Sequence, residues 1–451
     1  MIHAYTYNNK NIVIDVESGA VHILDNCSFD ILNLLDKINC KRCPDELYIK
    51  LEHKYNKIQI DEAYLELYEL YEQDMLFSER DYEINLQDNY PIKAICLHVA
   101  HDCNLRCQYC FAHGGDFAAG RKLMPFETAK KAIDFVVERS AERVNIEIDF
   151  FGGEPLMNMD VVKQTVAYAR SIEQKKHKNF RFTLTTNGIL LNDEIIEYLN
   201  KEMSNVVLSL DGRKEINDMM RPKAGGQGSY DTILPKYKKL VSEREDQNYY
   251  IRGTFTAKNL DFSKDVLHMK ELGFTQVSIE PVVLEENSEY ALNVKDLPKI
   301  FEEYDKLTEI MVEIQKKDEF FNFFHFMIDL DQGPCVVKRV KGCGCGNEYV
   351  AITPDGDIFP CHRFVDRPEL KMGNVNNNFD INKDMQAKYI KTTVLDKPEC
   401  EACWAKYFCS GGCSANNFIF NNDIMKAHKL SCELEKKRIE CAIYLQAVYA
   451  E

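Results

Sequence analysis

Short apolar segments alternate with amphipathic segments along the middle of the chain. Six of the apolar segments have the length of strands, and helical spacing follows them, as in 125–140 and 159–176. The expected strands are 93–100, 144–151, 180–186, 205–210, 250–257 and 275–283. Mostly apolar strands are typical of a parallel sheet that helices cover. The pattern predicts an α/β fold with a partial (β/α)6 TIM-like barrel, because a closed barrel needs eight units.

The first eighty residues have a different pattern. Strands are expected at 2–7, 12–16 and 21–24, and helices at about 28–38, 45–55 and 60–73. This order predicts a winged-helix-like α+β domain. It holds 8 Lys and Arg against 15 Asp and Glu, so we do not expect it to bind DNA. A long helix expected near 295–318 leads to a cysteine-rich tail, and we set the domains at 1–85, 86–325 and 326–451.

The composition is that of an ordinary globular protein. The 451 residues are 45% hydrophobic and 28% charged, with a net charge of −16. No apolar run approaches the ~18 residues that cross a bilayer, and the first residues do not resemble a secretory signal. We therefore expect a cytoplasmic protein with reduced thiols. The acidic balance argues against binding to nucleic acid or to an anionic membrane.

The 17 cysteines are unevenly distributed. None falls between 111 and 334, and ten lie from 335 onward. Three occur in C-x3-C-x2-C spacing directly after the first barrel strand, as Cys103, Cys107 and Cys110. Three thiolates suit a cluster or metal ion that keeps one position open. The alternative is a zinc loop that borrows a distant fourth ligand such as His113. His101 and His113 are expected to be exposed and receive no role.

This spacing resembles the signature of the radical S-adenosylmethionine (SAM) enzymes. The resemblance implies that Cys103, Cys107 and Cys110 are catalytic because they hold a 4Fe–4S cluster whose fourth iron SAM chelates. Further family motifs follow at strand ends in the same order: Gly152-Gly153-Glu154-Pro155, Thr185-Thr186-Asn187-Gly188 and Ser209-Leu210-Asp211-Gly212. Glycines let the backbone approach a ligand, a carboxylate can pair with an ammonium, and Arg221 could pair with the carboxylate of SAM. The implied SAM contacts are Tyr109, Gly152, Gly153, Glu154, Asn187, Ser209, Asp211 and Arg221.

The tail resembles the SPASM extension of radical SAM enzymes, which binds two auxiliary 4Fe–4S clusters. The likeness rests on Cys345, Gly356 and Cys361, followed by C-x2-C-x5-C-x3-C and a lone cysteine. It implies an outer cluster on Cys400, Cys403, Cys409 and Cys432, and an inner cluster on Cys345, Cys361 and Cys413. Zinc ribbons are the alternative, because C-x2-C recurs in them. Trp404, the only tryptophan, is expected to shield the outer cluster.

The fourth ligand of the inner cluster stays open. Cys335 and Cys343 are the candidates, and Cys343 crowds Cys345 in the run 342–346. An iron left without a protein ligand could accept a substrate thiolate. The remaining thiols fit no cluster pattern and are expected to be buried in apolar surroundings: Cys27, Cys40, Cys43, Cys96 and Cys441.

Taken together, the chain resembles the SCIFF maturases, radical SAM/SPASM enzymes that crosslink six-cysteine peptides. The resemblance implies that a 5′-deoxyadenosyl radical starts thioether formation between cysteine and a carbon of another residue. It also implies that residues 1–85 bind the leader of the precursor peptide. Flavodoxin or ferredoxin is the implied electron donor. Three 4Fe–4S clusters and SAM are the expected cofactors. The alternatives are a formylglycine-forming sulfatase maturase, a carbon–carbon peptide cyclase, and a zinc-dependent peptide-binding or regulatory protein.

Overall fold

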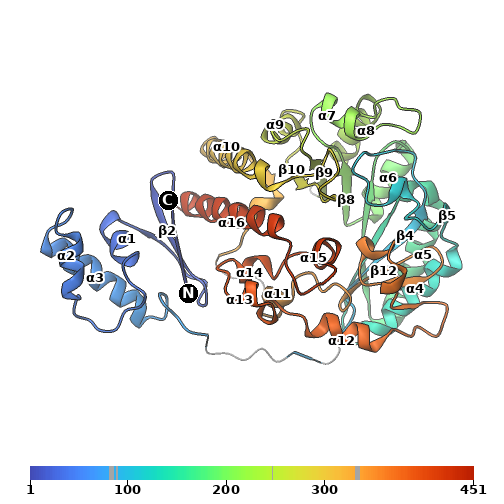
Figure 1. The fold of residues 1–451 in the computed structure, drawn as a ribbon. Coiled ribbons are helices and arrows are strands. Elements are labelled where there is room, and N and C mark those ends of the chain that lie inside the picture. The colour runs from blue at the N-terminus through green and yellow to red at the C-terminus, as the bar shows by residue number, and fades with distance from the viewer. Residues whose placement is uncertain (81–85, 88–89, 246, 331–335, 451) are drawn as a thin grey trace.

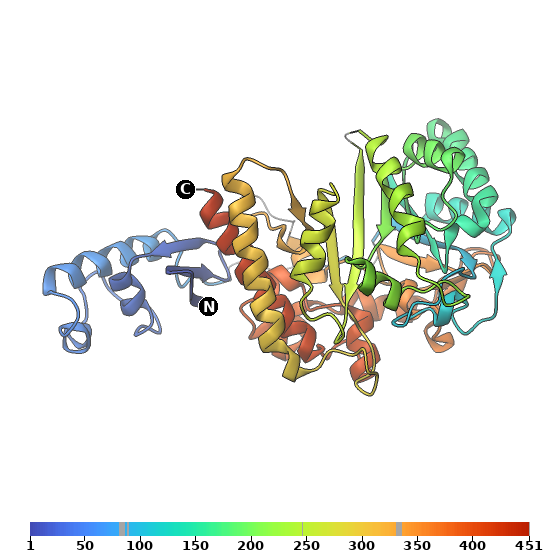
Figure 2. The same ribbon diagram turned by 90° about the horizontal axis from the view of Figure 1, so that it is seen from above.

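A parallel sheet forms the middle of the molecule. The computed structural model describes residues 1–80, 86–87, 90–245, 247–330 and 336–450 (Figures 1 and 2). The six expected barrel strands are all present and neighbour one another in chain order: β4 (Ala94–His101), β6 (Asn145–Gly152), β7 (Asn179–Thr186), β8 (Asn205–Ser209), β9 (Asn248–Phe255) and β10 (Gln276–Pro281). Two short strands join them, β5 (Lys122–Leu123) against β4 and β11 (Asn322–Phe323) against β10. The predicted partial barrel is confirmed.

Helices cover the outer face of this sheet. They are α4 (Phe126–Arg139), α5 (Met159–Lys176), α6 (Asp193–Glu202), α7 (Lys214–Met220), α8 (Tyr230–Ser242), α9 (Ser263–Glu271) and α10 (Leu297–Lys316). β4 is buried at all eight positions, whereas β6 and β7 bury every second side chain. The expectation of mostly apolar strands therefore holds best for β4. The less buried face of β6 and β7 includes Phe151 and Thr185, which reach the central cavity.

The C-terminal region extends the same sheet. β12 (Tyr349–Ile352) runs parallel to β4 with Ala351 opposite Cys96, and β13 (Asp357–Phe359) and β14 (Gly373–Asn374) continue it antiparallel. The helices of this region are α11 (Val336–Lys341), α12 (Lys383–Lys391), α13 (Pro398–Glu401), α14 (Lys406–Cys409), α15 (Ser414–Asn421) and α16 (Lys429–Tyr449). The cysteine-rich tail is thus joined to the barrel by backbone pairing.

The N-terminal strands form a separate antiparallel sheet. It consists of β1 (Ile2–Tyr7), β2 (Lys10–Asp15) and β3 (Val21–Leu24), and the helices α1 (Asn26–Leu32), α2 (Asp45–Leu51) and α3 (Lys57–Glu72) follow it. A capping box between Asn56 and Gln59 starts α3. The order of strands and helices is as expected, although α1 and α3 begin a few residues earlier.

Both faces of the N-terminal sheet are covered. Val13 packs with α1–α3, whereas Ile12 and Ile14 pack with the core that includes α10 and α16. The sheet consequently lies between its own helices and α16, as Figures 1 and 2 both show. Alternation along a strand places successive side chains on opposite faces, which allows β2 to join two cores.

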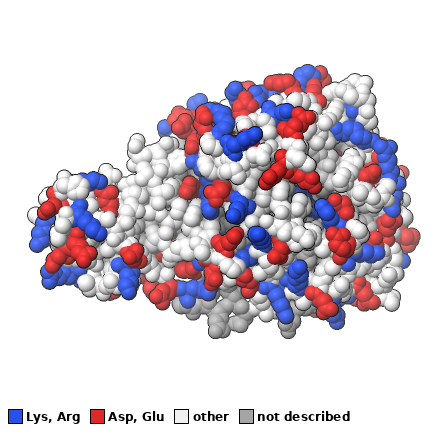
Figure 3. Space-filling model, in the orientation of Figure 1, with Lys and Arg blue, Asp and Glu red and all other residues white. Residues whose placement is uncertain are grey.

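The surface carries charges of both signs. Figure 3 shows Lys and Arg interspersed with Asp and Glu over the face that it displays. Within the described residues, no helix has the length and apolar character needed to cross a membrane.

Candidate functional site

The cysteine loop after β4 is held at the carboxyl ends of the barrel strands. It pairs with the end of α7 and the residues that follow, because the backbone N–H of Arg106 donates to Pro222 O (2.8 Å) and that of Gln108 donates to Met220 O (2.9 Å). The thiols of Cys103 and Cys107 face a central cavity, and burial raises their pKa to about 11 and about 12. Burial therefore favours the neutral form of both thiols over the thiolate.

Two glycines after β6 allow the chain to pass close to this loop. Gly152 has a φ of 131°, and a Cβ there would lie 2.2 Å from Ala100 O. A Cβ on Gly153 would lie 2.3 Å from Asp102 O. Any side chain at either position would collide with backbone, so the motif expected from the sequence has a steric cause.

Glu154 follows the two glycines and is buried at 1% exposure. Its carboxyl group accepts hydrogen bonds from Thr186 Oγ1 (2.7 Å), Asn187 N (2.8 Å) and Leu156 N (3.1 Å). Burial raises its pKa to about 7, against these hydrogen bonds. The carboxylate lacks a cationic partner within hydrogen-bonding distance among the described residues, which suits it to an incoming ammonium group.

Tyr109, Asp211 and Arg221 form a buried network at the cavity. The Tyr109 hydroxyl donates to Asp211 (2.7 Å), and Arg221 Nη1 donates to the Tyr109 oxygen (2.6 Å). Asp211 is fully buried and does not line the cavity, whereas the other seven expected SAM contacts do. Arg221 Nε is buried and has no hydrogen-bond partner among the described residues, so it is available to a bound anion.

The cavity has a volume of about 240 Å³, and its second wall was not foreseen from the sequence. This wall includes Phe111, Phe151, Arg252, Glu280, His362 and Arg363. Arg252 pairs with Glu280 at 3.4 Å. The available signal was position in the sequence, since Glu280 lies in the last half of the strand predicted at 275–283 and Arg363 follows Cys361 by two residues.

Arg363 belongs to the tail, and its guanidinium side chain lines the barrel cavity. Its Nη1 donates to Asn416 Oδ1 (3.0 Å), and its guanidinium lies 5.4 Å from the centre of the Phe111 ring. Its Nε is buried and lacks a hydrogen-bond partner among the described residues. Its backbone N–H donates to Cys361 Sγ at 3.3 Å. Arg363 thereby links the barrel cavity to the tail cysteines.

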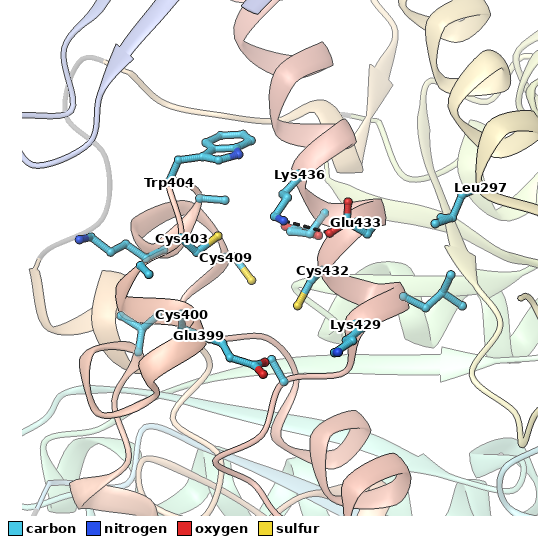
Figure 4. A pocket seen from close by; sticks show the side chains of 18 of the residues that line it. Leu297, Glu399, Cys400, Cys403, Trp404, Cys409, Lys429, Cys432, Glu433 and Lys436 are labelled. Carbon is cyan, nitrogen blue, oxygen red and sulfur yellow. Dashed lines mark hydrogen bonds and ion pairs between the residues drawn. The ribbon is translucent and has the colours of Figure 1, made fainter. Parts of the chain in front are cut away.

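A second cavity, of about 540 Å³, is lined mostly by the tail, together with Val294 and Leu297. Its lining includes Trp404 and all four cysteines expected at the outer cluster, Cys400, Cys403, Cys409 and Cys432. Figure 4 shows the sulfur atoms of Cys403, Cys409 and Cys432 facing one space. Lys397, 4% exposed, donates to Gly411 O (2.9 Å), and burial lowers its pKa although thiolates at Cys400, Cys409 and Cys432 would raise it. Four thiols around one cavity of this size can hold a bulky iron–sulfur cluster.

Four further cysteines gather between this cavity and the barrel. The Cys345 thiol donates to Pro360 O (3.4 Å), and its interaction with the neighbouring Cys361 thiol raises the pKa of Cys345 and lowers that of Cys361. Cys343 and Cys413 lie near enough to raise the pKa of Cys345 by charge repulsion. Cys343 therefore lies with the three expected inner ligands. Cys335 lies outside the described residues.

Two expectations about single residues were wrong. His101 is 1% exposed and lies beside His98, with 3.2 Å between Nε2 and Nδ1, because β4 continues to this residue. Cys40 is exposed, whereas Cys27, Cys43, Cys96 and Cys441 are buried as expected. His113 is exposed and lies 3.6 Å from Asp366. Among the described residues, no three His, Cys, Asp or Glu side chains are close enough to hold a single metal ion.

Family models match two parts of the chain. Residues 97–297 match the radical SAM superfamily, and residues 343–404 match an iron–sulfur cluster-binding domain, SPASM. These parts contain the three cysteines after β4 and five of the eight tail cysteines that face or adjoin the second cavity, while Cys409, Cys413 and Cys432 lie beyond residue 404.

Known proteins resemble the chain over different lengths. A cysteine-type anaerobic sulfatase-maturating enzyme of Clostridium novyi is 26% identical over 70% of this chain and 86% of its own. The radical SAM cyclopropyl synthase TigE of Paramaledivibacter caminithermalis is 24% identical over 93% of this chain and 89% of its own. The structure of Streptococcus suis SuiB bound to precursor peptide SuiA has a TM-score of 0.53 at 16% identity and covers 94% of this chain and 97% of that chain.

Proposed function

Because this chain is a radical SAM enzyme with a C-terminal SPASM domain, we propose that it matures a ribosomally made peptide by thioether formation. In the reaction, a cysteine sulfur is joined to a carbon of another residue. SAM and its 4Fe–4S cluster, when bound, supply a 5′-deoxyadenosyl radical that removes hydrogen from an unactivated carbon. Cys103, Cys107 and Cys110 would hold this cluster, and Glu154 and Arg221 would bind the ammonium and carboxylate groups of SAM.

The tail cysteines would hold two auxiliary clusters. Cys400, Cys403, Cys409 and Cys432 would ligate the outer cluster, and Cys343, Cys345, Cys361 and Cys413 the inner one. The position of Cys343 favours a fully ligated inner cluster, so we do not place the substrate thiolate there.

The single observation that favours a thiolate substrate is Arg363. Its side chain lines the same cavity as the expected SAM-binding residues, and its buried Nε lacks a hydrogen-bond partner among the described residues. A guanidinium stabilises a sulfur anion through a charge-assisted hydrogen bond and holds it near the reacting carbon. Each C–S bond that forms removes two hydrogen atoms from the peptide, one from sulfur and one from carbon.

Residues 1–85 would recognise the leader of the precursor. Neither outer edge of the three-stranded sheet pairs with another strand of the described residues, and an extended peptide can add to such an edge. The structure of SuiB, which is bound to its precursor peptide SuiA, matches over 94% of this chain and therefore shares the fold of most of it, including part of this region. We retain 86–325 for the barrel and 326–451 for the cluster domain, with flavodoxin or ferredoxin as electron donor.

Carbon–carbon bond formation is the second candidate. The observation that favours it is the 93% coverage of this chain by a cyclopropyl synthase. Sulfatase maturation has less support, because the C. novyi relative covers 70% of this chain.

Mass spectrometry of a cysteine-rich peptide encoded beside this chain separates these candidates. With SAM and reductant, we expect the peptide to lose two hydrogens per bridge and to lose its reactivity toward a thiol-alkylating reagent. A carbon–carbon product keeps its thiols free, and formylglycine formation removes sulfur; either result contradicts the proposal.

Arg363→Ala tests the role of the cation. Loss of a charge-assisted hydrogen bond of about 1.5–3 kcal/mol should slow crosslinking about 10- to 100-fold, while iron content and 5′-deoxyadenosine formation remain unchanged. Arg367→Ala removes an exposed guanidinium from the same segment and is the matched control. Equal crosslinking rates in the two variants would exclude this role for Arg363.

A further inference from the structure

The N-terminal domain contacts the loop that carries two of the outer-cluster cysteines. This loop runs from Cys403 to Cys409 and includes Trp404, Lys406 and Tyr407, and Trp404 and Lys406 line the outer cavity. The contacts come from β1 and from the turn after β2, more than 380 residues earlier in the chain.

His3 of β1 covers Trp404. The two rings are stacked, with 3.8 Å between their centres and 2° between their planes. His3 Nε2 lies 2.9 Å from Glu440 Oε1 of α16, which fixes the imidazole in this place. The tryptophan over the cavity is therefore held from its outer side by the N-terminal sheet.

Glu17 pairs with the cation of the same loop. Lys406 Nζ donates to Glu17 Oε1 (2.6 Å), and the Tyr407 hydroxyl donates to Glu17 Oε2 (2.8 Å). The side chains of Lys406 and Glu17 are only 4% and 12% exposed. A buried ion pair of this kind is costly to break, because the remaining charge has no solvent to screen it.

Val16 brings apolar contact beside this ion pair. It is 3% exposed and packs in a cluster with Cys400, Tyr407 and Val394. The turn that carries it is rigid, since the fully buried Asp15 accepts from Ser18 N (3.0 Å) and Ser78 N (3.0 Å). The turn therefore has a fixed conformation where it contacts the loop from Cys403 to Cys409.

We propose that the N-terminal domain is part of the outer-cluster site: His3 and Val16 position the loop of Cys403–Cys409, and Glu17 sets the charge beside the cluster and thereby its reduction potential. This rests on the outer-cluster ligands assigned under the proposed function. A cluster potential responds to nearby charge and to solvent exposure. Without Glu17, the ammonium of Lys406 is uncompensated and favours the more negative, reduced cluster.

A redox titration followed by electron paramagnetic resonance of the holoenzyme tests the charge effect. The outer-cluster signal is the one that disappears in Cys400→Ala/Cys403→Ala, and the other two clusters serve as internal references. We expect Glu17→Gln to raise the outer midpoint potential, Lys406→Met to lower it, and the double variant to lie between them. Asp30→Asn, which breaks the Asp30–Lys54 pair of the same domain (2.9 Å), is the matched control and should leave the potential unchanged.

Iron content and amide hydrogen exchange test the positioning. Faster exchange in 403–409 for His3→Ala or Glu17→Gln, or loss of about four irons with the other clusters retained, supports the proposal. Full iron with unchanged potential and exchange in Glu17→Gln overturns it, as does an equal loss from all three clusters. If wild-type protein has no outer-cluster signal, the ligand assignment itself fails, which is a distinct result.

Discussion

At the residue scale, the cavity wall that we propose for SAM contains Glu154, whose carboxyl group is buried in the folded chain. Three donors hold Glu154, yet burial outweighs them and raises its pKa to about 7. The folded chain keeps a costly group in the cavity, which is typical of a binding site. Arg221 Nε is a second such group, since it lacks a hydrogen-bond partner among the described residues.

Glu154→Gln should weaken SAM binding about 10-fold or more, because a charge-assisted hydrogen bond to the SAM ammonium is lost. Because the raised pKa favours the neutral acid, wild-type affinity should fall as the pH drops below about 7, and the variant should lose this dependence. Equilibrium dialysis with SAM measures both effects. Glu280→Gln, on the opposite wall, is the control. A variant with wild-type affinity and pH profile would contradict the role of Glu154.

At the element scale, two strands connect parts of the chain that the sequence separates. β12 pairs with β4, which places Arg363 beside the barrel cavity. β2 joins two cores through its alternating faces. The outer edge of β3 remains available for a peptide, and Ile23 of this strand is 46% exposed.

Ile23→Lys should weaken binding of the precursor peptide about tenfold, because an exposed apolar contact beside the open edge is lost and lysine discourages strand addition. Fluorescence anisotropy of the labelled precursor measures the affinity. Ile49→Lys changes a 72% exposed isoleucine of α2 and is the matched control. Equal affinities in the two variants would direct the search for the leader site away from β3.

At the scale of the whole molecule, the two cavities and the cysteines between them follow one another from the barrel toward the N-terminal domain. The barrel cavity, the inner cysteines and the outer cavity follow one another, and the N-terminal sheet closes the far end. Cys361 belongs to the inner group while its neighbours His362 and Arg363 line the barrel cavity. Under the proposed function, this arrangement would suit the transfer of an electron away from the substrate peptide.

Anaerobically purified protein should contain about twelve irons per chain, as three 4Fe–4S clusters require. Cys400→Ala/Cys403→Ala should reduce the count to about eight, because the outer cavity loses half its thiols. Iron and sulfide analysis measures the count, and Cys27→Ala, a buried thiol remote from both cavities, is the control. Two or three zinc ions without a brown chromophore would exclude the cluster assignment.

Local features of the sequence predicted the barrel strands and one wall of the cavity. Apolar runs with turn residues marked each strand, and ligand motifs lay at strand ends, where parallel strands bring them together. The prediction of an exposed His101 was wrong. The strand expected to end at residue 100 continues to His101, which pairs with Lys122 and is buried. The prediction was also wrong for Cys40, since neighbouring polar residues gave no sign of which side of a loop faces solvent.

The sequence by itself determined the cysteine spacing, the glycines that let backbone pass backbone, and the order of strands and helices, because each depends on residues near one another in the chain. Only the tertiary structure decided that Cys343 joins the inner cysteines, that Arg363 reaches the barrel, and that Glu17 pairs with Lys406. Such contacts depend on how elements that are distant in the chain pack together. The sequence near a charged residue does not show which distant side chain it will contact once both are buried.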